Sequence, residues 1–149
     1  MMVSKGKKED IEFGLRSECS VIKLLKTKIR DVQKTDTFNE FDFRSDEYKI
    51  DLELKTRNIY KGQYDTIFFG QNKLIEGRTR KQNGTSLRTI YLFRFNSRKE
   101  VGKKVVYFWE DDGQEMDIVM CGNYRRGENA KPLVNLDINK LQPLKNLII

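Results

Sequence analysis

The chain has 149 residues and contains no histidine, and it has only two cysteines and two prolines. The lack of histidine excludes Ser-His hydrolases, nucleases that depend on histidine and ordinary zinc hydrolases. Hydrolytic chemistry in this chain would therefore have to rely on carboxylates, lysine and a hard metal ion.

The two cysteines, Cys19 and Cys121, are too far apart in the sequence to form the pairs that bind structural metals. We expect both to be reduced thiols in the core of an intracellular protein. The sequence shows no secretory signal and no apolar run of membrane-spanning length, so no membrane partner is expected. The expected location is the cytoplasm or the nucleoid, and a viral or phage origin is compatible with either.

The charge balance is strongly basic: 29 Lys and Arg against 22 Asp and Glu give a formal net charge of +7. Such a charge favours a polyanionic partner, and a generally basic, soluble surface is the alternative. Nine Phe, six Tyr and one Trp indicate a packed interior. The length fits a single domain over residues 1–149, in which residues 1–8 are expected to form a basic, flexible arm.

The hydrophobic pattern predicts helices and strands in a mixed order. Residues 9–29 carry apolar residues at helical spacing, among them Cys19, Ile22 and Leu25, and residues 66–81 form a second helical candidate that contains two glycines. Strands are predicted at 40–44, 49–57, 87–95, 105–109, 116–120 and 133–138, with a turn or short edge strand in 31–39. This order predicts an α/β domain whose central mixed sheet is flanked by helices.

The most informative segment is residues 49–57, in which charged and apolar residues alternate. Because side chains in a strand alternate between faces, the charged residues share one face and the apolar residues share the other. The charged face carries Asp51, Glu53 and Lys55, and we expect it to point outward from the core. Carboxylates beside a lysine can hold a divalent metal and polarise a phosphate or a water.

The turn before this segment decides which second carboxylate lies near Glu53. If residues 46–49 form a four-residue turn, Asp42 lies directly across from Glu53, with Cβ atoms about 4.5–5.5 Å apart. A tighter turn would place Glu53 about 13 Å further along the strand, and Asp51 would then have to replace Asp42. We favour Asp42 and keep Asp51 as the alternative.

An acidic helix residue, an Asp on one strand and a Glu-x-Lys on the next resemble the PD-(D/E)xK nuclease superfamily, which includes restriction endonucleases and Holliday-junction resolvases. The resemblance covers about residues 14–73. Asp42 stands at the position of the family's strand Asp, and Glu53 and Lys55 match its Glu-x-Lys element. Phe41 stands where the proline of the family name would be.

The resemblance implies a site, a mechanism and a fold. Glu18 would be a third carboxylate, although it could instead be an exposed helix residue, and the Leu54 carbonyl would be a backbone ligand. One or two Mg²⁺ ions, for which Mn²⁺ substitutes, would be held by Asp42, Glu53 and Glu18. Lys55 would orient the attacking water. The implied fold is restriction-endonuclease-like, an αβββαβ core with additional C-terminal strands.

The implied function is that of a Mg²⁺-dependent DNA endonuclease acting as a homodimer. Junction resolution, homing, and viral or phage DNA processing are all open. The alternatives are a non-catalytic nucleic-acid-binding protein on a degenerate nuclease fold and an RNA-cleaving enzyme with the same site. The candidate contacts to nucleic acid are Arg57, Lys61, Gln71, Lys73, Arg78, Arg80, Lys81, Arg125 and Arg126.

Overall fold

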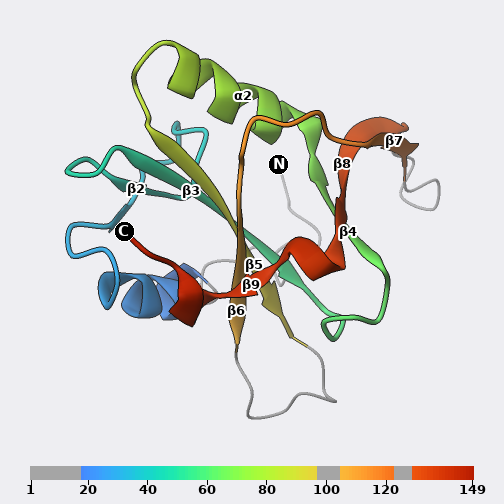
Figure 1. Cartoon of the computed structure of the whole chain (residues 1–149), viewed down its shortest axis with the longest axis horizontal. Helices are drawn as coiled ribbons and strands as arrows, with labels where there is room; N and C mark the ends of the chain where they lie inside the picture. Colours follow the sequence, from blue (N-terminus) through green and yellow to red (C-terminus); the bar gives the residue numbers. More distant parts are fainter. Residues whose placement is uncertain (1–17, 97–104, 123–128) are drawn as a thin grey trace, which may run out of the picture.

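The computed structural model describes residues 18–96, 105–122 and 129–149 (Figure 1). One α-helix covers residues 18–26, and a second, α2, spans Gln71–Gln82. The strands are β1 (Gln33–Lys34), β2 (Phe43–Ser45), β3 (Ile50–Arg57), β4 (Thr66–Gly70), β5 (Arg88–Phe95), β6 (Val106–Glu110), β7 (Ile118–Cys121), β8 (Lys131–Asp137) and β9 (Gln142–Pro143). Two 3₁₀ turns, η3 (Ile138–Lys140) and η4 (Leu144–Asn146), lie near the C-terminus.

These strands form two sheets. The central sheet has the order β1-β2-β3-β5-β6-β9, and the second has the order β4-β8-β7. Strands β3 and β5 run parallel, whereas the other neighbouring pairs run antiparallel. The prediction of an α/β domain with a central mixed sheet is thus confirmed. The described residues do not by themselves identify a specific fold.

Two hydrophobic clusters lie on opposite faces of the central sheet. On one face, Leu25 of the first helix packs with Leu52 of β3 and Leu92 of β5. On the other face, Tyr91 of β5 stacks on Phe69 of β4 with ring centroids 4.5 Å apart, and Leu74 of α2 joins this cluster. The central sheet is therefore covered by the first helix on one side and by α2 and the second sheet on the other.

The helix predicted over residues 66–81 is wrong in its first part. Residues 66–70 form β4, and α2 begins only after Gly70, which is its extended N-cap. Ile67 and Phe69 are buried whereas Phe68 is 38% exposed, which is the two-residue alternation of a strand. Gly70, one of the two glycines in the predicted helix, therefore marks the boundary between strand and helix.

The first helix buries only part of the predicted stripe. Leu25 is fully buried and Ile22 is partly buried against the same core cluster, as predicted, whereas Cys19 is exposed. Val21, one helical turn before Leu25, is fully buried as well. Cys121, at the end of β7, is exposed too, so the prediction of core thiols is wrong. In the described ranges, no helix has the length and apolarity to cross a membrane. The predicted arm over residues 1–8 lies outside these ranges.

Candidate active site

The turn between β2 and β3 has the four residues that the sequence favoured. Residues 46–49 form the turn, and Phe43 pairs with Leu52 across the two strands. Asp42 immediately precedes β2, and its Oδ2 accepts a hydrogen bond of 2.8 Å from the Leu54 N–H. The register therefore brings the Asp42 carboxylate to the backbone of β3, and the tighter turn is excluded.

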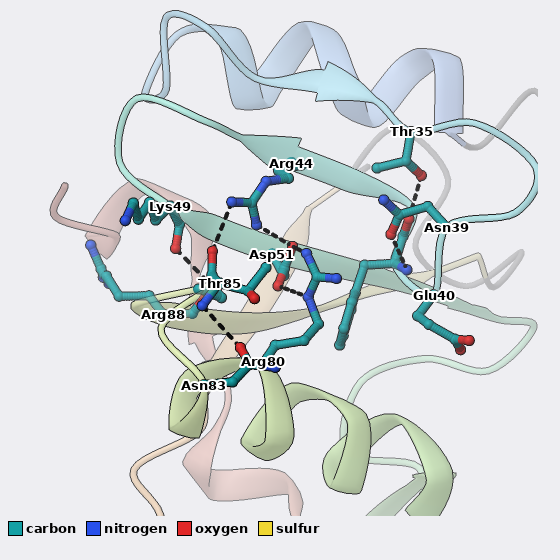
Figure 2. Close-up of polar contacts among 12 residues, drawn as sticks. Thr35, Asn39, Glu40, Arg44, Lys49, Asp51, Arg80, Asn83, Thr85 and Arg88 are labelled. Atoms are coloured by element: carbon teal, nitrogen blue, oxygen red, sulfur yellow. Dashed lines mark hydrogen bonds and ion pairs between the residues drawn. The ribbon is translucent and has the colours of Figure 1, made fainter.

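Asp51 has a structural role in this geometry (Figure 2). It is fully buried and contacts Arg44 Nη1 of β2 at 2.9 Å and Arg80 Nε of α2 at 2.6 Å. Two guanidinium groups therefore satisfy its carboxylate and connect α2 to the central sheet. Of the two candidates for the partner of Glu53, the contacts favour Asp42.

Glu53 is the central acidic residue of the site, and it is only 4% exposed. Its Oε1 lies 3.5 Å from the Lys55 ammonium, and its Oε2 lies 3.6 Å from the Lys73 ammonium. Oε2 is buried without a hydrogen-bond partner among the described residues. Burial, followed by the charge of Asp42, raises the pKa of Glu53 to about 7, although the two lysines oppose this shift.

The expectation that the charged face of β3 points outward is wrong for its acidic residues. Asp51 and Glu53 are both buried because α2 lies across this face of the strand (Figure 2). Lys55, the next residue on the same face, is 24% exposed. The site therefore has a buried acidic end and a more accessible basic end.

Lys73 enters the site from the first turn of α2. Besides its contact with Glu53, the Lys73 ammonium donates to the Glu40 carbonyl and lies 5.8 Å from the centre of the Phe41 ring. The Tyr91 hydroxyl donates to the Lys73 carbonyl at 2.9 Å, which fixes the first turn of α2 on β5. Gln71, the first residue of α2, is partly exposed.

Glu18, the third predicted carboxylate, forms an ion pair with Lys34. Its Oε2 contacts the Lys34 ammonium at 2.9 Å, and this hydrogen bond raises the pKa of Lys34. Glu18 and Asp42 line one pocket of about 230 Å³. Within the described residues, no three acidic or cysteine side chains lie close enough together to hold one metal ion. The role of Glu18 as a third ligand stays a prediction, and the two carboxylates that the strand register brings together are those of Asp42 and Glu53.

The carboxylates of Asp42 and Glu53 fit a hard divalent cation. Mg²⁺ in proteins is commonly held by one or two carboxylates and keeps several waters, so two carboxylates are sufficient. The buried Oε2 of Glu53 supports this fit, because it has no hydrogen-bond partner among the described residues and such buried polar atoms are rare. The donor set of Asp42, Glu53 and the Leu54 backbone consists of oxygen atoms, which suit Mg²⁺ or Mn²⁺.

Besides Lys73, two of the predicted nucleic-acid contacts form ion pairs within the fold. Arg78 donates to Asp111 through Nε and Nη2, both at 3.0 Å, and Arg80 pairs with Asp51. These contacts give both arginines a structural role, which the sequence did not indicate because their partners are about thirty residues away in the chain.

Other predicted contacts retain basic groups for a ligand. Arg57 donates to the Phe68 carbonyl at 3.0 Å, burial lowers its pKa, and no carboxylate among the described residues pairs with it. Lys61 lies 4.9 Å from the centre of the Tyr107 ring. Lys81 is partly exposed in the last turn of α2. Arg125 and Arg126 lie outside the described residues.

Sequence reasoning missed Lys34 as a residue near the site. Lys34 lies on β1 and pairs with Phe43 of β2, which places its side chain in the pocket that Asp42 also lines. The only sequence signal was the expected edge strand in residues 31–39, which carried no side-chain assignment.

Comparisons with protein-family models, with curated proteins and with solved structures find no match for this chain. The side chains around Glu53 are therefore the evidence on which a function can be proposed.

Proposed function

We propose that the chain is a metal-dependent nuclease. Asp42 and Glu53, with the Leu54 carbonyl, would hold Mg²⁺ or Mn²⁺, and Lys55 and Lys73 would contact a phosphate of the nucleic acid. The observation that carries this proposal is the buried Glu53 carboxylate, which lies between two ammonium groups and whose Oε2 has no hydrogen-bond partner among the described residues. Perturbed carboxylates of this kind are concentrated at functional sites.

The restriction-endonuclease-like fold is part of the same proposal. The first helix, three strands that end in β3, helix α2 and the parallel strand β5 follow one another in the chain, with β4 inserted before α2. This order supports an αβββαβ core. The C-terminal strands β6 to β9 would be additions to it.

The acidic and basic residues of the site would have different roles. Glu53 and Asp42 would supply negative charge in a buried place, where it attracts a cation more strongly than it would in water. A divalent cation there supplies Lewis acidity toward a phosphate oxygen and lowers the pKa of a water. Lys55, whose side chain reaches the surface, would donate to a phosphate oxygen and hold the substrate against the carboxylates. Lys73 would do the same from α2.

A second candidate is a nucleic-acid-binding protein without catalysis. The observation that favours it is that Lys55 and Lys73 already compensate Glu53, while Glu18 is paired with Lys34 instead of joining the other carboxylates. This candidate predicts salt-sensitive binding and no turnover with a metal.

Cleavage assays separate the two candidates. Plasmid DNA, branched DNA and a matched RNA are incubated with the full chain with and without Mg²⁺. Cleavage is expected only with Mg²⁺. Asp42→Asn or Glu53→Gln is expected to lower the cleavage rate about 100-fold or more, because the bound ion lowers the activation barrier by several kcal/mol. Glu47→Gln, an exposed carboxylate on the adjacent turn, is the matched control. Equal rates in all three variants would remove the proposed site.

A further inference from the structure

The loop that leads to Asp42 presents an aromatic side chain to solvent. Phe38 is 95% exposed, more than any other large hydrophobic side chain in the described residues. It lies four positions before Asp42, on the connection from β1 to β2. Three positions further on, Phe41 is 1% exposed and belongs to the core, so one phenylalanine anchors this loop and the other projects from it.

Backbone hydrogen bonds hold this loop in one shape. The Thr35 N–H donates to the Asp42 carbonyl at 3.0 Å, which closes the loop at its base. At its tip, the Phe38 N–H donates to Asp36 Oδ1 at 3.1 Å, and the Asn39 N–H donates to the Asp36 carbonyl at 3.2 Å. Figure 2 shows Thr35 and Asn39 directed into the loop. Phe38 therefore projects from a turn whose backbone is already ordered. Binding of a ligand to the ring would cost little further loop entropy.

We propose that Phe38 stacks on an unpaired base next to the phosphate that the enzyme cleaves. This inference rests on the proposed function and names its substrate class: nucleic acid with a branch, a flap or a frayed end. Every base offers a π-face to an aromatic ring. In an intact duplex, however, a base must first be unstacked at a cost of a few kcal/mol, so a substrate whose base is already free is preferred.

The surroundings of Phe38 favour a base over a protein partner. The residues that flank Phe38 in this turn are one acidic residue, Asp36, and two polar residues, Thr37 and Asn39, so the ring has no apolar neighbour in the turn. A stable protein interface buries about 800 Å² on each partner, which one ring within a polar loop does not supply. Lys73 lies near the end of the loop, where its ammonium donates to the Glu40 carbonyl, and can contact a phosphate beside a stacked base.

Binding of a fluorescent base tests the proposal without the need for cleavage. The probe is a branched DNA with 2-aminopurine at the unpaired position next to the branch, compared with a fully paired duplex of the same sequence, both in EDTA. Wild type is expected to quench the 2-aminopurine of the branched DNA. Phe38→Ala is expected to lose the quenching and to bind branched DNA about 5- to 150-fold more weakly, since stacking contributes about 1–3 kcal/mol per base. Its affinity for the duplex should change less than about 2-fold on the same reasoning.

Two variants make the result specific. Phe38→Trp should restore the quenching, because Trp retains an aromatic face. Tyr64→Ala removes another exposed aromatic residue, on the connection from β3 to β4, and should leave the preference for branched DNA unchanged. Because Phe38 is exposed, all these variants should fold like wild type, which circular dichroism checks.

The outcomes distinguish this inference from the nuclease proposal. If Phe38→Ala binds both DNAs like wild type, or loses both equally, the stacking proposal is wrong even when cleavage is intact. If sedimentation shows that Phe38→Ala converts a dimer to a monomer, a second copy covers the ring and the proposal is also wrong. If quenching depends on Phe38 but no metal-dependent cleavage occurs, stacking stands and the nuclease proposal fails.

Discussion

At the scale of single residues, the proposed function depends most on Glu53. The strand alternation of residues 49–57 correctly placed Glu53 on one face with Asp51 and Lys55. Alternation cannot indicate what covers that face, because the covering element, α2, follows about twenty residues later in the chain. The sequence therefore predicted that Asp42 lies across from Glu53 on the neighbouring strand. The burial of Glu53 could be seen only in the structure.

The raised pKa of Glu53 predicts a pH dependence of stability. Between its ordinary pKa of 4.5 and its folded value of about 7, the folded chain holds a proton that the unfolded chain releases. The contribution of Glu53 to the free energy of unfolding therefore falls as pH rises through this window, by about 3 kcal/mol in total. Glu53→Gln cannot ionise, so its stability relative to wild type should rise from pH 5 to pH 8. Urea unfolding in EDTA at both pH values measures this.

The control for this pH prediction is Glu47→Gln, which removes an exposed carboxylate from the turn before β3. Its stability relative to wild type should be the same at pH 5 and pH 8. If Glu53→Gln behaves like this control, the carboxylate of Glu53 is not perturbed in the folded protein and the description of the site is wrong.

The ion pairs of Asp51 predict a large loss of stability when the charge of its side chain is removed. Asp51→Asn would leave the guanidinium groups of Arg44 and Arg80 partly buried without their carboxylate, which costs about 3–5 kcal/mol. Asp46→Asn is the matched control: Asp46 also pairs with Arg44, at 2.7 Å, but is 90% exposed and should cost about 1 kcal/mol or less. Urea unfolding compares the two. Equal losses would contradict the role of Asp51 in holding α2.

At the scale of secondary-structure elements, the position of α2 depends on close packing at Gly77. A Cβ atom added there would lie 2.9 Å from Thr89 Cγ2 and 3.1 Å from the Tyr91 hydroxyl, and both of these β5 residues are fully buried. The absence of a side chain at Gly77 therefore allows α2 to approach β5, and this approach brings Lys73 and Arg80 to the acidic residues of β3.

Gly77→Ala sets helix propensity against this packing. Alanine favours the helix by about 1 kcal/mol over glycine, whereas overpacking costs about 1–3 kcal/mol. Since Thr89 and Tyr91 cannot move into solvent, we expect a net loss of about 1 kcal/mol in the free energy of unfolding. Thr79→Ala, at an exposed position of α2, should be neutral or slightly stabilising. A Gly77→Ala variant that is more stable than wild type would show that α2 is not closely packed there.

The elements were predictable to the extent that their signals are local. Every predicted strand is observed with its ends shifted by a few residues, because alternation and turn residues act over short distances. The boundary between β4 and α2 was missed because residues 66–69 are apolar enough for either structure, and only their pairing with β8 makes them a strand. The ion pairs of Arg78 and Arg80 were missed for the same reason: tertiary contacts decide them.

At the scale of the whole molecule, the count of 29 Lys and Arg overstates the number of positive groups that are free to contact a ligand. The guanidinium groups of Arg78, Arg80 and Arg88 are compensated by carboxylates, Arg88 by Glu110 at 2.6 Å. Lys55 and Lys73 share the single carboxylate of Glu53. Phosphate contacts are therefore expected around Glu53 and not at Arg78, Arg80 or Arg88.

This distribution predicts which residues control the salt dependence of DNA binding. Lys73→Gln should reduce the slope of log K against log salt concentration by about 0.9, the contribution of one phosphate contact on duplex DNA. Arg88→Gln removes the same charge from an ion pair and should leave the slope unchanged. Fluorescence anisotropy over a range of salt concentrations measures both slopes. Equal reductions would mean that overall charge, and not a defined surface, binds the DNA.

The central claim is that Asp42 and Glu53 bind one divalent cation together, and a calorimetric titration of the full chain with Mn²⁺ tests it most directly. The account predicts binding to wild type and to Glu47→Gln, and loss of at least about 10-fold in affinity in Asp42→Asn and in Glu53→Gln, since each removes a charged ligand. Binding that is equally strong in Glu53→Gln, or absent from wild type, would contradict it.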